Sequence, residues 1–280
     1  RRDNAVTVGS FNFSESVLLA EIYAQALEAA GIPVKREFEV GTREDVEPAL
    51  EQGLLDVVPE YLGTALAFLD PGSAGALPDA PAAHRRLSEI LARRGVRALA
   101  YAPAENQNGV VVTPRTAEQY GLRAVSDLGP VAGNLTFGGP PECPRRPFCL
   151  LGLQSTYGLR FRDFLPLDSG GRLTRNALEE GQVDVGLLFT TDGHLAGGEF
   201  VLLADDRRLQ PSENVVPVVR AEVIERHGDR LVRRLEAVSA ALTTPELAGL
   251  NRRVDIDGQR PGDVAAEWLR SHGLAGRTPD

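Results

Sequence analysis

Two stretches of this 280-residue sequence repeat one pattern: ALEQGLLDVVPEYLGT at residues 49–64 and ALEEGQVDVGLLFTTDG at residues 177–193. Over the first nine positions, Ala, Leu, Glu, Gly, Asp and Val recur in register. The pattern predicts a helix that ends at a glycine, followed by an aspartate that opens a buried strand. Two copies indicate two lobes that are built alike. The alternative is that helix–glycine–strand is a generic joint of an α/β protein.

Strands and helices alternate around these stretches. Before residue 107 the sequence predicts strands at Ala5–Gly9, Val34–Val40, Leu55–Pro59 and Val96–Tyr101, with helices after residue 12 and at Arg43–Gln52 and His84–Arg94. The pattern then restarts, with strands at Gly109–Thr113, Leu135–Phe137, Val183–Phe189, Glu199–Ala204 and Val215–Arg220, a helix at Leu173–Glu180 and helices beyond Ala221. This alternation predicts βαβ units and a parallel sheet. A surface loop is expected at Pro71–Ala83.

Composition and charge exclude several classes of protein. Apolar residues make up 42% of the chain and the net charge is −9, which indicates a folded protein and argues against nucleic acid as a partner. No apolar stretch reaches 18 residues, so no membrane span is expected. The sequence holds no Met and starts at Arg1, from which we expect that a leader was removed. A trimmed cytosolic protein is the alternative.

The two cysteines, Cys143 and Cys149, lie six residues apart in a Pro-rich segment. A zinc site would need two further ligands, and no histidine lies nearby. A disulfide that closes a short loop fits best and indicates an oxidising compartment. Two unconnected buried thiols remain the alternative.

Catalytic signals are weak. The four histidines are scattered, and no phosphate-binding or nucleophile motif is present. Glu15 and Glu60 are the best candidate acids, but structural roles are favoured for both. Asn12 followed by Glu15 has the spacing of a capping box, and Glu60 fits a turn or a contact between lobes. We therefore expect no catalytic residue, no metal and no cofactor.

The chemistry of recognition is better represented. Tyr61 and Phe189 occupy matching positions at the ends of the two repeated strands, where ligands bind in open α/β sheets. Their rings would suit a desolvated cation, although both rings could instead lie in the core. Helix N-termini are expected at Ser14 and Thr191, with free N–H groups for a polar ligand. We expect ligand contacts from Asn12, Glu15, Ser16, Tyr61, Thr64, Asn106, Asn108, Arg146, Phe189, Thr190, Thr191 and Asp192.

Four segments together resemble a known family: GSFNFSES at 9–16, the two repeated stretches, and PPECPRRPFCLLGLQSTYGL at 140–159. They look like the osmoprotectant substrate-binding proteins of ABC importers, a family associated with glycine betaine, choline and carnitine. The resemblance implies an α/β, periplasmic-binding-protein-like fold of two lobes, with a ligand cleft and two chain crossovers. Lobe 1 would comprise residues 1–106 and 214–280, and lobe 2 residues 107–213.

Some family positions are kept in this sequence. The resemblance places Tyr61 at the cage tyrosine, Thr64 at its neighbouring hydroxyl, and Arg146 where members that bind a carboxylate have an arginine. Ser16 falls where many members have a glutamine. The resemblance implies a receptor that closes on a small osmoprotectant-like solute and delivers it to a membrane permease. It would act as a monomer outside the cytoplasm, either in the periplasm or as an anchored lipoprotein.

Other positions depart from the family. Asn108, Leu150 and Phe189 occupy three further cage positions, and Phe11 replaces a common lysine. Because asparagine and leucine offer no π face and phenylalanine has no hydroxyl, these changes leave room for a larger or less cationic solute beside a quaternary ammonium compound. Two rival functions remain: an enzyme on the same two-lobed scaffold, and a ligand-sensing domain of a larger receptor or permease fusion.

Overall fold

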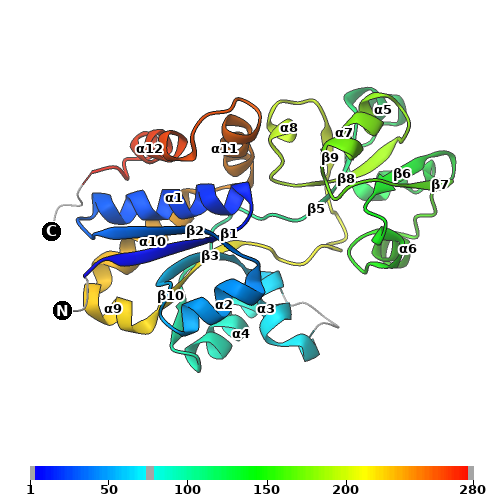
Figure 1. Ribbon diagram of the computed structural model, residues 1–280. Helices are drawn as coiled ribbons and strands as arrows, with labels where there is room; N and C mark the ends of the chain where they lie inside the picture. Colours follow the sequence, from blue (N-terminus) through cyan, green and yellow to red (C-terminus); the bar gives the residue numbers. More distant parts are fainter. Residues whose placement is uncertain (1–3, 74–78, 277–280) are drawn as a thin grey trace. The chain divides into compact units, whose positions relative to one another are not determined.

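The computed structural model describes residues 4–73 and 79–276 and divides into two compact units. Unit 1 comprises the chain up to Glu105 and from Ser212 onward, and unit 2 comprises Asn106–Pro211. The chain therefore passes between the units twice. Figure 1 shows a sheet with surrounding helices in each of them. The expected α/β class is confirmed.

The sheet of unit 1 mixes parallel and antiparallel strands. Its five described strands lie in the order β2 (Val34–Gly41), β1 (Val6–Phe11), β3 (Val57–Tyr61), β10 (Val215–Arg220) and β4 (Val96–Ala98). Strands β2, β1 and β3 are parallel, whereas β10 is antiparallel to β3 and β4. The prediction of a parallel sheet therefore holds for β2, β1 and β3 and is wrong for β10 and β4. The chain returns from unit 2 directly into β10 without a crossover helix, and a parallel strand needs one.

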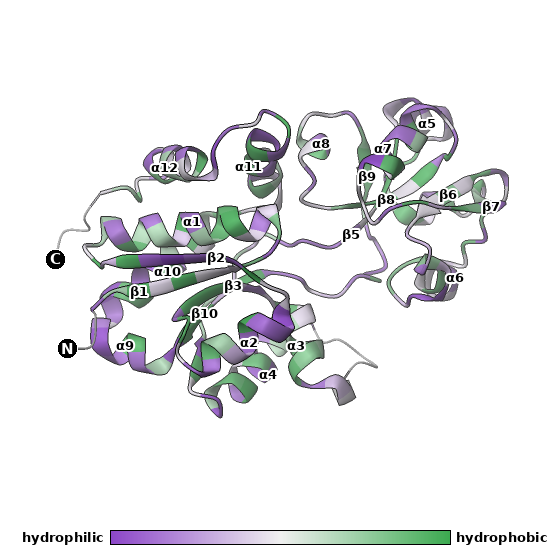
Figure 2. Ribbon diagram, viewed as in Figure 1, coloured by the Kyte–Doolittle hydropathy of each residue, from purple (hydrophilic) through white to green (hydrophobic). Residues whose placement is uncertain are grey.

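Helices cover both faces of this sheet. One layer packs α1 (Ser14–Ala29) against α10 (Asp229–Ala241), α11 (Thr244–Asp255) and α12 (Pro261–Ser271). A second apolar cluster joins the other face to α2 (Arg43–Glu51), α3 (Leu62–Leu69) and α4 (Ala80–Ala92), and α9 (Ala221–His227) follows β10. Figure 2 shows the edge strand β2 as hydrophilic, whereas the inner strands β3 and β10 are more hydrophobic. Charged edges of this kind discourage pairing with other chains.

Unit 2 has a sheet of its own. The described strands lie in the order β7 (Asp163–Pro166), β6 (Thr136–Gly139), β8 (Val185–Phe189), β5 (Asn108–Val112) and β9 (Val201–Leu203). Strand β8 runs parallel to β6 and antiparallel to β5. The helices of this unit are α5 (Pro114–Tyr120), α6 (Leu150–Tyr157), α7 (Arg172–Glu179) and the short α8 (Gly193–Ala196).

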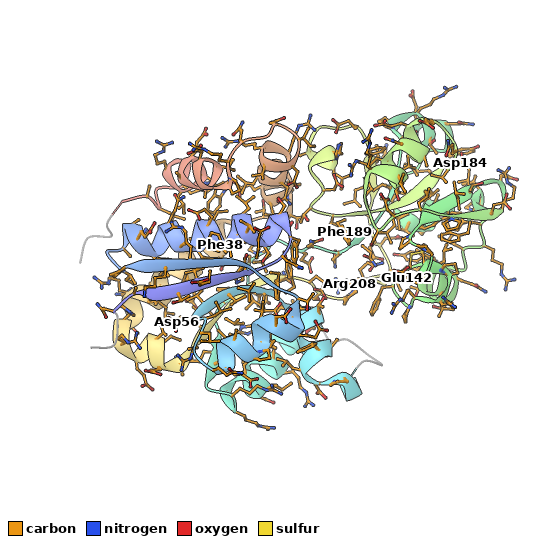
Figure 3. The ribbon with its side chains drawn as sticks, viewed as in Figure 1. Phe38, Asp56, Glu142, Asp184, Phe189 and Arg208 are labelled. Atoms are coloured by element: carbon orange, nitrogen blue, oxygen red, sulfur yellow. A yellow bond between two sulfur atoms is a disulfide. The ribbon has the colours of Figure 1, made fainter. Side chains whose placement is uncertain are left out.

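The two repeated stretches form the same joint in each unit. In unit 1 the backbone N–H of Asp56 donates to the carbonyl of Thr7 at 2.8 Å, and the Asp56 carboxylate accepts from the Thr7 N–H at 2.9 Å. In unit 2, Asp184 makes the same two bonds with Thr136, both at 2.9 Å. Figure 3 labels both aspartates. Each therefore fixes the start of one strand, β3 or β8, beside its parallel neighbour.

Several predicted bounds shift in the structure. The strand expected at Leu55–Pro59 lies at Val57–Tyr61: it starts directly after Asp56, as the repeated pattern indicates, and extends to Tyr61. The loop expected at Pro71–Ala83 falls partly outside the described residues. Of its described part, Pro71–Ser73 is a 3-10 turn and α4 begins at Ala80.

Candidate functional site

Three aromatic rings gather where β1 and β3 end in unit 1. Phe11 ends β1, Phe13 immediately precedes α1, and Tyr61 ends β3. The rings of Phe11 and Phe13 stack with centroids 5.9 Å apart, and those of Phe13 and Tyr61 with centroids 6.2 Å apart. We call these three residues the aromatic ladder. Phe13 is 42% exposed, whereas Phe11 and Tyr61 are buried, so the ladder presents mainly Phe13 to solvent.

Glu15 lies behind the ladder rather than at a helix cap. The Tyr61 hydroxyl donates to Glu15 Oε1 at 2.5 Å, and Asn251 Nδ2 donates to Glu15 Oε2 at 2.7 Å. The helix begins at Ser14 as expected, but its cap residue is Phe13 and no side chain caps it. The capping box predicted from Asn12 and Glu15 is therefore wrong. The Glu15 carboxylate instead joins β3 to α11.

The other predicted residues of this segment hold the backbone. Ser16 is fully buried, and its Oγ accepts from the Phe11 N–H at 2.9 Å. Asn12 is exposed, and its N–H donates to the Gly41 carbonyl at 3.1 Å. Both residues thus fix the turn that carries Phe13 from β1 into α1.

Thr64 is tied to a buried acid. Thr64 is exposed, and its hydroxyl donates to Glu213 Oε2 at 2.8 Å. Glu213 is 7% exposed, and burial raises its pKa to about 8, although the Thr64 bond acts in the opposite direction. Gly63 leaves room for this contact, because a Cβ there would lie 2.3 Å from Glu213 Oε1.

A buried ion pair lies beside this acid. Arg43 donates from Nε and Nη2 to the two carboxylate oxygens of Glu60, at 2.8 and 2.6 Å. Glu60 also accepts from the Tyr61 N–H at 3.0 Å. Burial and the neighbouring Glu60 carboxylate raise the pKa of Glu47 to about 8. Glu60 lies inside β3, so the expectation of a turn at this position is wrong; the residue anchors Arg43 instead.

The predicted residues of unit 2 meet around the end of β8. Asn108 pairs opposite Phe189 in the sheet, and the Thr190 N–H donates to the Gln107 carbonyl at 2.9 Å. Phe189, labelled in Figure 3, is half-buried against Gly170, where a Cβ would lie 3.1 Å from the ring. Asn108 and Thr190 also line a cavity of about 100 Å³. Asn106 is half-buried just before this group.

The second predicted helix N-terminus is displaced. Helix α8 begins at Gly193, not at Thr191, and Asp192 caps it by accepting from the His194 N–H at 2.8 Å. Asp192 also lies 3.7 Å from Arg175 Nη1. Thr191 is 2% exposed. The expectation for Thr191 is therefore wrong, because Asp192 is the better capping residue and stands one position later.

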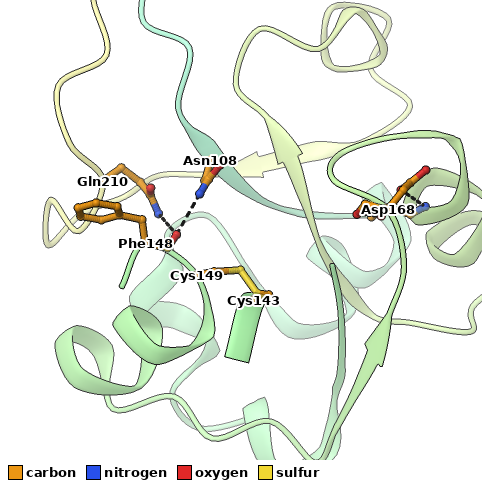
Figure 4. Close-up of a disulfide and its surroundings, with 7 residues drawn as sticks. Asn108, Cys143, Phe148, Cys149, Asp168 and Gln210 are labelled. Carbon is orange, nitrogen blue, oxygen red and sulfur yellow. Dashed lines mark hydrogen bonds between the residues drawn. A yellow bond between two sulfur atoms is a disulfide. The ribbon is translucent and has the colours of Figure 1, made fainter. Parts of the chain in front are cut away.

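The predicted disulfide is confirmed. Cys143 and Cys149 are bonded, with Cα atoms 5.1 Å apart, and exposed Arg146 lies on the loop that they close. Figure 4 shows how this loop is held: the Phe148 carbonyl accepts from Asn108 Nδ2 at 3.2 Å and from Gln210 Nε2 at 3.0 Å. The disulfide loop is thus tied to the start of β5.

Phe13 is the site residue that the sequence interpretation missed. It directly follows Asn12, an expected solute contact, and it belongs to the segment GSFNFSES that carries the family resemblance. An aromatic residue at the end of a strand and just before a helix was the available signal. The repeated pattern indicates Tyr61 and Phe189 but not Phe13, which has no counterpart in it.

Comparison with known proteins identifies the family. The model for the substrate-binding domain of ABC-type glycine betaine transport systems matches residues 4–271. The chain belongs to this family. A glycine-betaine-binding protein of Pseudomonas aeruginosa is 33% identical over 95% of this chain and 88% of its own length. The glycine betaine-binding protein YehZ of Escherichia coli is 28% identical over 96% and 90%.

A solved structure agrees in fold. A glycine betaine/carnitine/choline ABC transporter structure superposes with a TM-score of 0.87 at 24% identity, covering 96% of this chain and 99% of that chain. The periplasmic-binding-protein fold and the family resemblance expected from the sequence are confirmed. By its family, the chain is the substrate-binding component of an ABC transport system. Domains of this family are extracytoplasmic, bind small solutes for a permease and are not enzymes.

Two further observations concern the described residues. Among them, no helix is both long and apolar enough to cross a membrane. Over the same part of the chain, no group of three or more His, Cys, Asp or Glu side chains is arranged to hold a metal ion.

We predict that this substrate-binding domain stays folded without its disulfide. Replacing both Cys143 and Cys149 by serine opens a short loop. Closure of this loop contributes on the order of 2 kcal/mol to the free energy of unfolding. The apolar cluster that contains both cysteines also includes Leu153 and Phe137. Urea unfolding of the double variant measures the loss. Global unfolding at room temperature in the absence of urea would contradict the prediction.

Proposed function

We propose that this chain captures a solute with a trimethylammonium group, glycine betaine or choline or a related compound, and delivers it to its permease. The observation that carries the proposal is the exposed Phe13 ring stacked on Tyr61 where β3 ends. A desolvated quaternary ammonium is attracted to aromatic faces, and this attraction contributes from about 0.5 to 2 kcal/mol. The names of the two glycine betaine-binding relatives support the same chemistry.

The aromatic ladder is relevant to the cage positions at which this sequence lacks the family's tyrosines. Asn108 and Phe189 depart from the family's cage tyrosines. Phe13 adds an exposed ring next to Tyr61 that the sequence interpretation did not include. We propose that Phe13 supplies π surface that these departures remove, so that a trimethylammonium solute remains the leading candidate.

The accessible residues among the remaining predicted ones enter the proposal as solute contacts. Backbone and side-chain polar groups at the strand ends suit the polar part of a betaine or an alcohol, and Arg146 suits a carboxylate. This set comprises Asn12, Thr64, Asn106, Asn108, Arg146, Phe189, Thr190 and Asp192, which are exposed or half-buried. Glu15, Ser16 and Thr191 are buried and enter the proposal as supports of neighbouring residues. We propose that the protein acts as a monomer, without nucleic acid, in the periplasm or as an anchored lipoprotein.

Solute binding tests the proposal directly. Glycine betaine, choline and carnitine are titrated into the protein by calorimetry, with proline and a polyol as solutes that lack a trimethylammonium group. A binder also raises the melting temperature in proportion to the logarithm of its concentration. Binding of proline or the polyol alone would refute the proposed solute class.

We predict that Tyr61→Ala weakens binding of the trimethylammonium solute by roughly 1–2 kcal/mol, because it removes one ring and the support of Phe13. The matched control is Tyr101→Ala in the same unit, whose ring packs on His84 with centroids 5.4 Å apart. Calorimetric titration measures both variants. Equal affinities for Tyr61→Ala and Tyr101→Ala would remove Tyr61 from the site.

A further inference from the structure

A buried carboxylate is joined to the aromatic ladder through one hydrogen bond. Glu15 is 7% exposed, and its Oε1 accepts from the Tyr61 hydroxyl at 2.5 Å. Tyr61 in turn stacks on Phe13, the exposed ring of the ladder. The Glu15 charge is thus one hydrogen bond and one ring contact away from the surface that the proposed function gives to the solute.

We infer that Glu15 sets the charge preference of this site, favouring a trimethylammonium solute of net positive charge over a zwitterion with the same head group. The inference rests on the proposed function and names the solute class more narrowly: the site binds a cation such as choline more tightly than glycine betaine. Glu15 acts through Tyr61, so it is a positioning residue.

The physical basis is polarisation of the Tyr61 ring. A hydroxyl that donates to a carboxylate makes a charge-assisted bond, roughly twice as strong as one between neutral groups. The donated proton moves toward Glu15 and leaves electron density on the phenol ring, so the ring face becomes more negative. Chains of hydrogen bonds at low local dielectric strengthen this effect. A more negative face binds a cation more tightly.

The same charge acts against a zwitterion. Glycine betaine brings a carboxylate together with its ammonium group, and like charges repel more strongly where water is excluded. Choline brings a hydroxyl in place of that carboxylate. A negative charge behind Tyr61 therefore separates these two solutes, although both present the same head group to the rings.

Two contacts define the ends of this arrangement. Asn251, which comes from α11, donates to Glu15 Oε2 at 2.7 Å and so fixes the carboxylate from the side opposite Tyr61. At the far end of the ladder, the Arg43 guanidinium lies 4.9 Å from the centroid of the Phe11 ring. One end of the ladder thus faces a cation of the protein, and the other is linked to an anion.

The test compares affinities for choline and for glycine betaine in the whole protein by calorimetry. Glu15→Gln keeps a hydrogen-bond acceptor for Tyr61 but removes the charge. We expect the ratio of choline to glycine betaine affinity to fall about fivefold. Glu21→Gln is the matched control, because Glu21 is a buried carboxylate of the same helix that bonds Arg36 instead. It should leave the ratio within about twofold.

Tyr61→Phe provides a second variant that does not depend on the folding of Glu15→Gln. It keeps the ring and removes the hydroxyl that joins it to Glu15. We expect the affinity ratio to move in the same direction, and Glu15→Gln to add less in this background than in the wild type. If one solute binds too weakly to measure, the affinity for the other alone is compared between variant and wild type. The affinity for choline must then fall, or the affinity for glycine betaine must rise.

The outcomes separate the two proposals. A wild-type protein that binds neither solute nor carnitine refutes the proposed function. If the wild-type protein binds them but the affinity ratio is unchanged in Glu15→Gln, only the role of Glu15 is refuted. Where Glu15→Gln does not fold, an unchanged ratio in Tyr61→Phe decides the same point. A fall in the ratio that Glu21→Gln reproduces equally also overturns that role, because it would then reflect net charge.

Discussion

Replacing Arg43 with methionine is expected to lower the free energy of unfolding by about 3–5 kcal/mol, because it leaves a buried carboxylate without its cation. Glu60 is 1% exposed and takes two hydrogen bonds from Arg43. The buried acids Glu47 and Glu213 lie close to the same pair, and burial raises the pKa of each to about 8. Methionine fills much of the same volume, so the loss measures mainly the missing charge.

An exposed arginine provides the control for this substitution. Arg94 pairs with Glu51, and both side chains are exposed. Arg94→Met should cost no more than about 1 kcal/mol. The double variant Arg43→Met, Glu60→Gln should recover part of the loss, because it leaves no unpaired charge. Urea unfolding followed by the fluorescence of Trp268, the single tryptophan, reports on unit 1. Equal losses for Arg43→Met and Arg94→Met would contradict the prediction.

The repeated pattern predicted part of the fold because its cause is local. A helix end, a glycine with positive φ and a strand start follow one another within a few residues, at Gly53 and again at Gly181. The aspartate of each copy then meets the backbone of the parallel neighbour, at Thr7 and at Thr136. Similar sequences could therefore be expected to give similar joints.

Strand direction did not follow from the same pattern. Alternation of strands and helices predicts parallel pairing only where a helix connects two strands of one sheet. The residues before β10 come from unit 2, and the chain enters the sheet antiparallel to β3. Local periodicity carries no information on this long connection.

The candidate site was only partly predictable for a related reason. Tyr61 was found from its place at the end of a strand, but its partners lie 46 and 48 residues away, at Glu15 and Phe13. Asn251 is 236 residues from Glu15. The spacing of Asn12 and Glu15 is typical of a capping box. Glu15 instead bonds Tyr61 and Asn251, which are distant from it in the sequence.

The stability of unit 1 is expected to fall as the pH rises from about 5 to 8. Burial raises the pKa of Glu47 and of Glu213 to about 8, from a usual value of 4.5. Between these two values the folded protein keeps protons that the unfolded chain has lost, so rising pH favours unfolding. Each group contributes a slope of up to about 1.4 kcal/mol per pH unit, and the slope vanishes above its folded pKa.

Glutamine variants isolate this effect from other titrating groups. Glu47→Gln carries no charge at any pH, so its stability relative to the wild type should rise steadily between pH 5 and 8 and then level off. Glu51→Gln, an exposed position of the same helix, should run parallel to the wild type. Urea unfolding at each pH, followed through Trp268, gives the three curves. Parallel curves for Glu47→Gln and the wild type would contradict the prediction. They would mean that Glu47 is already ionised in the folded protein near pH 5.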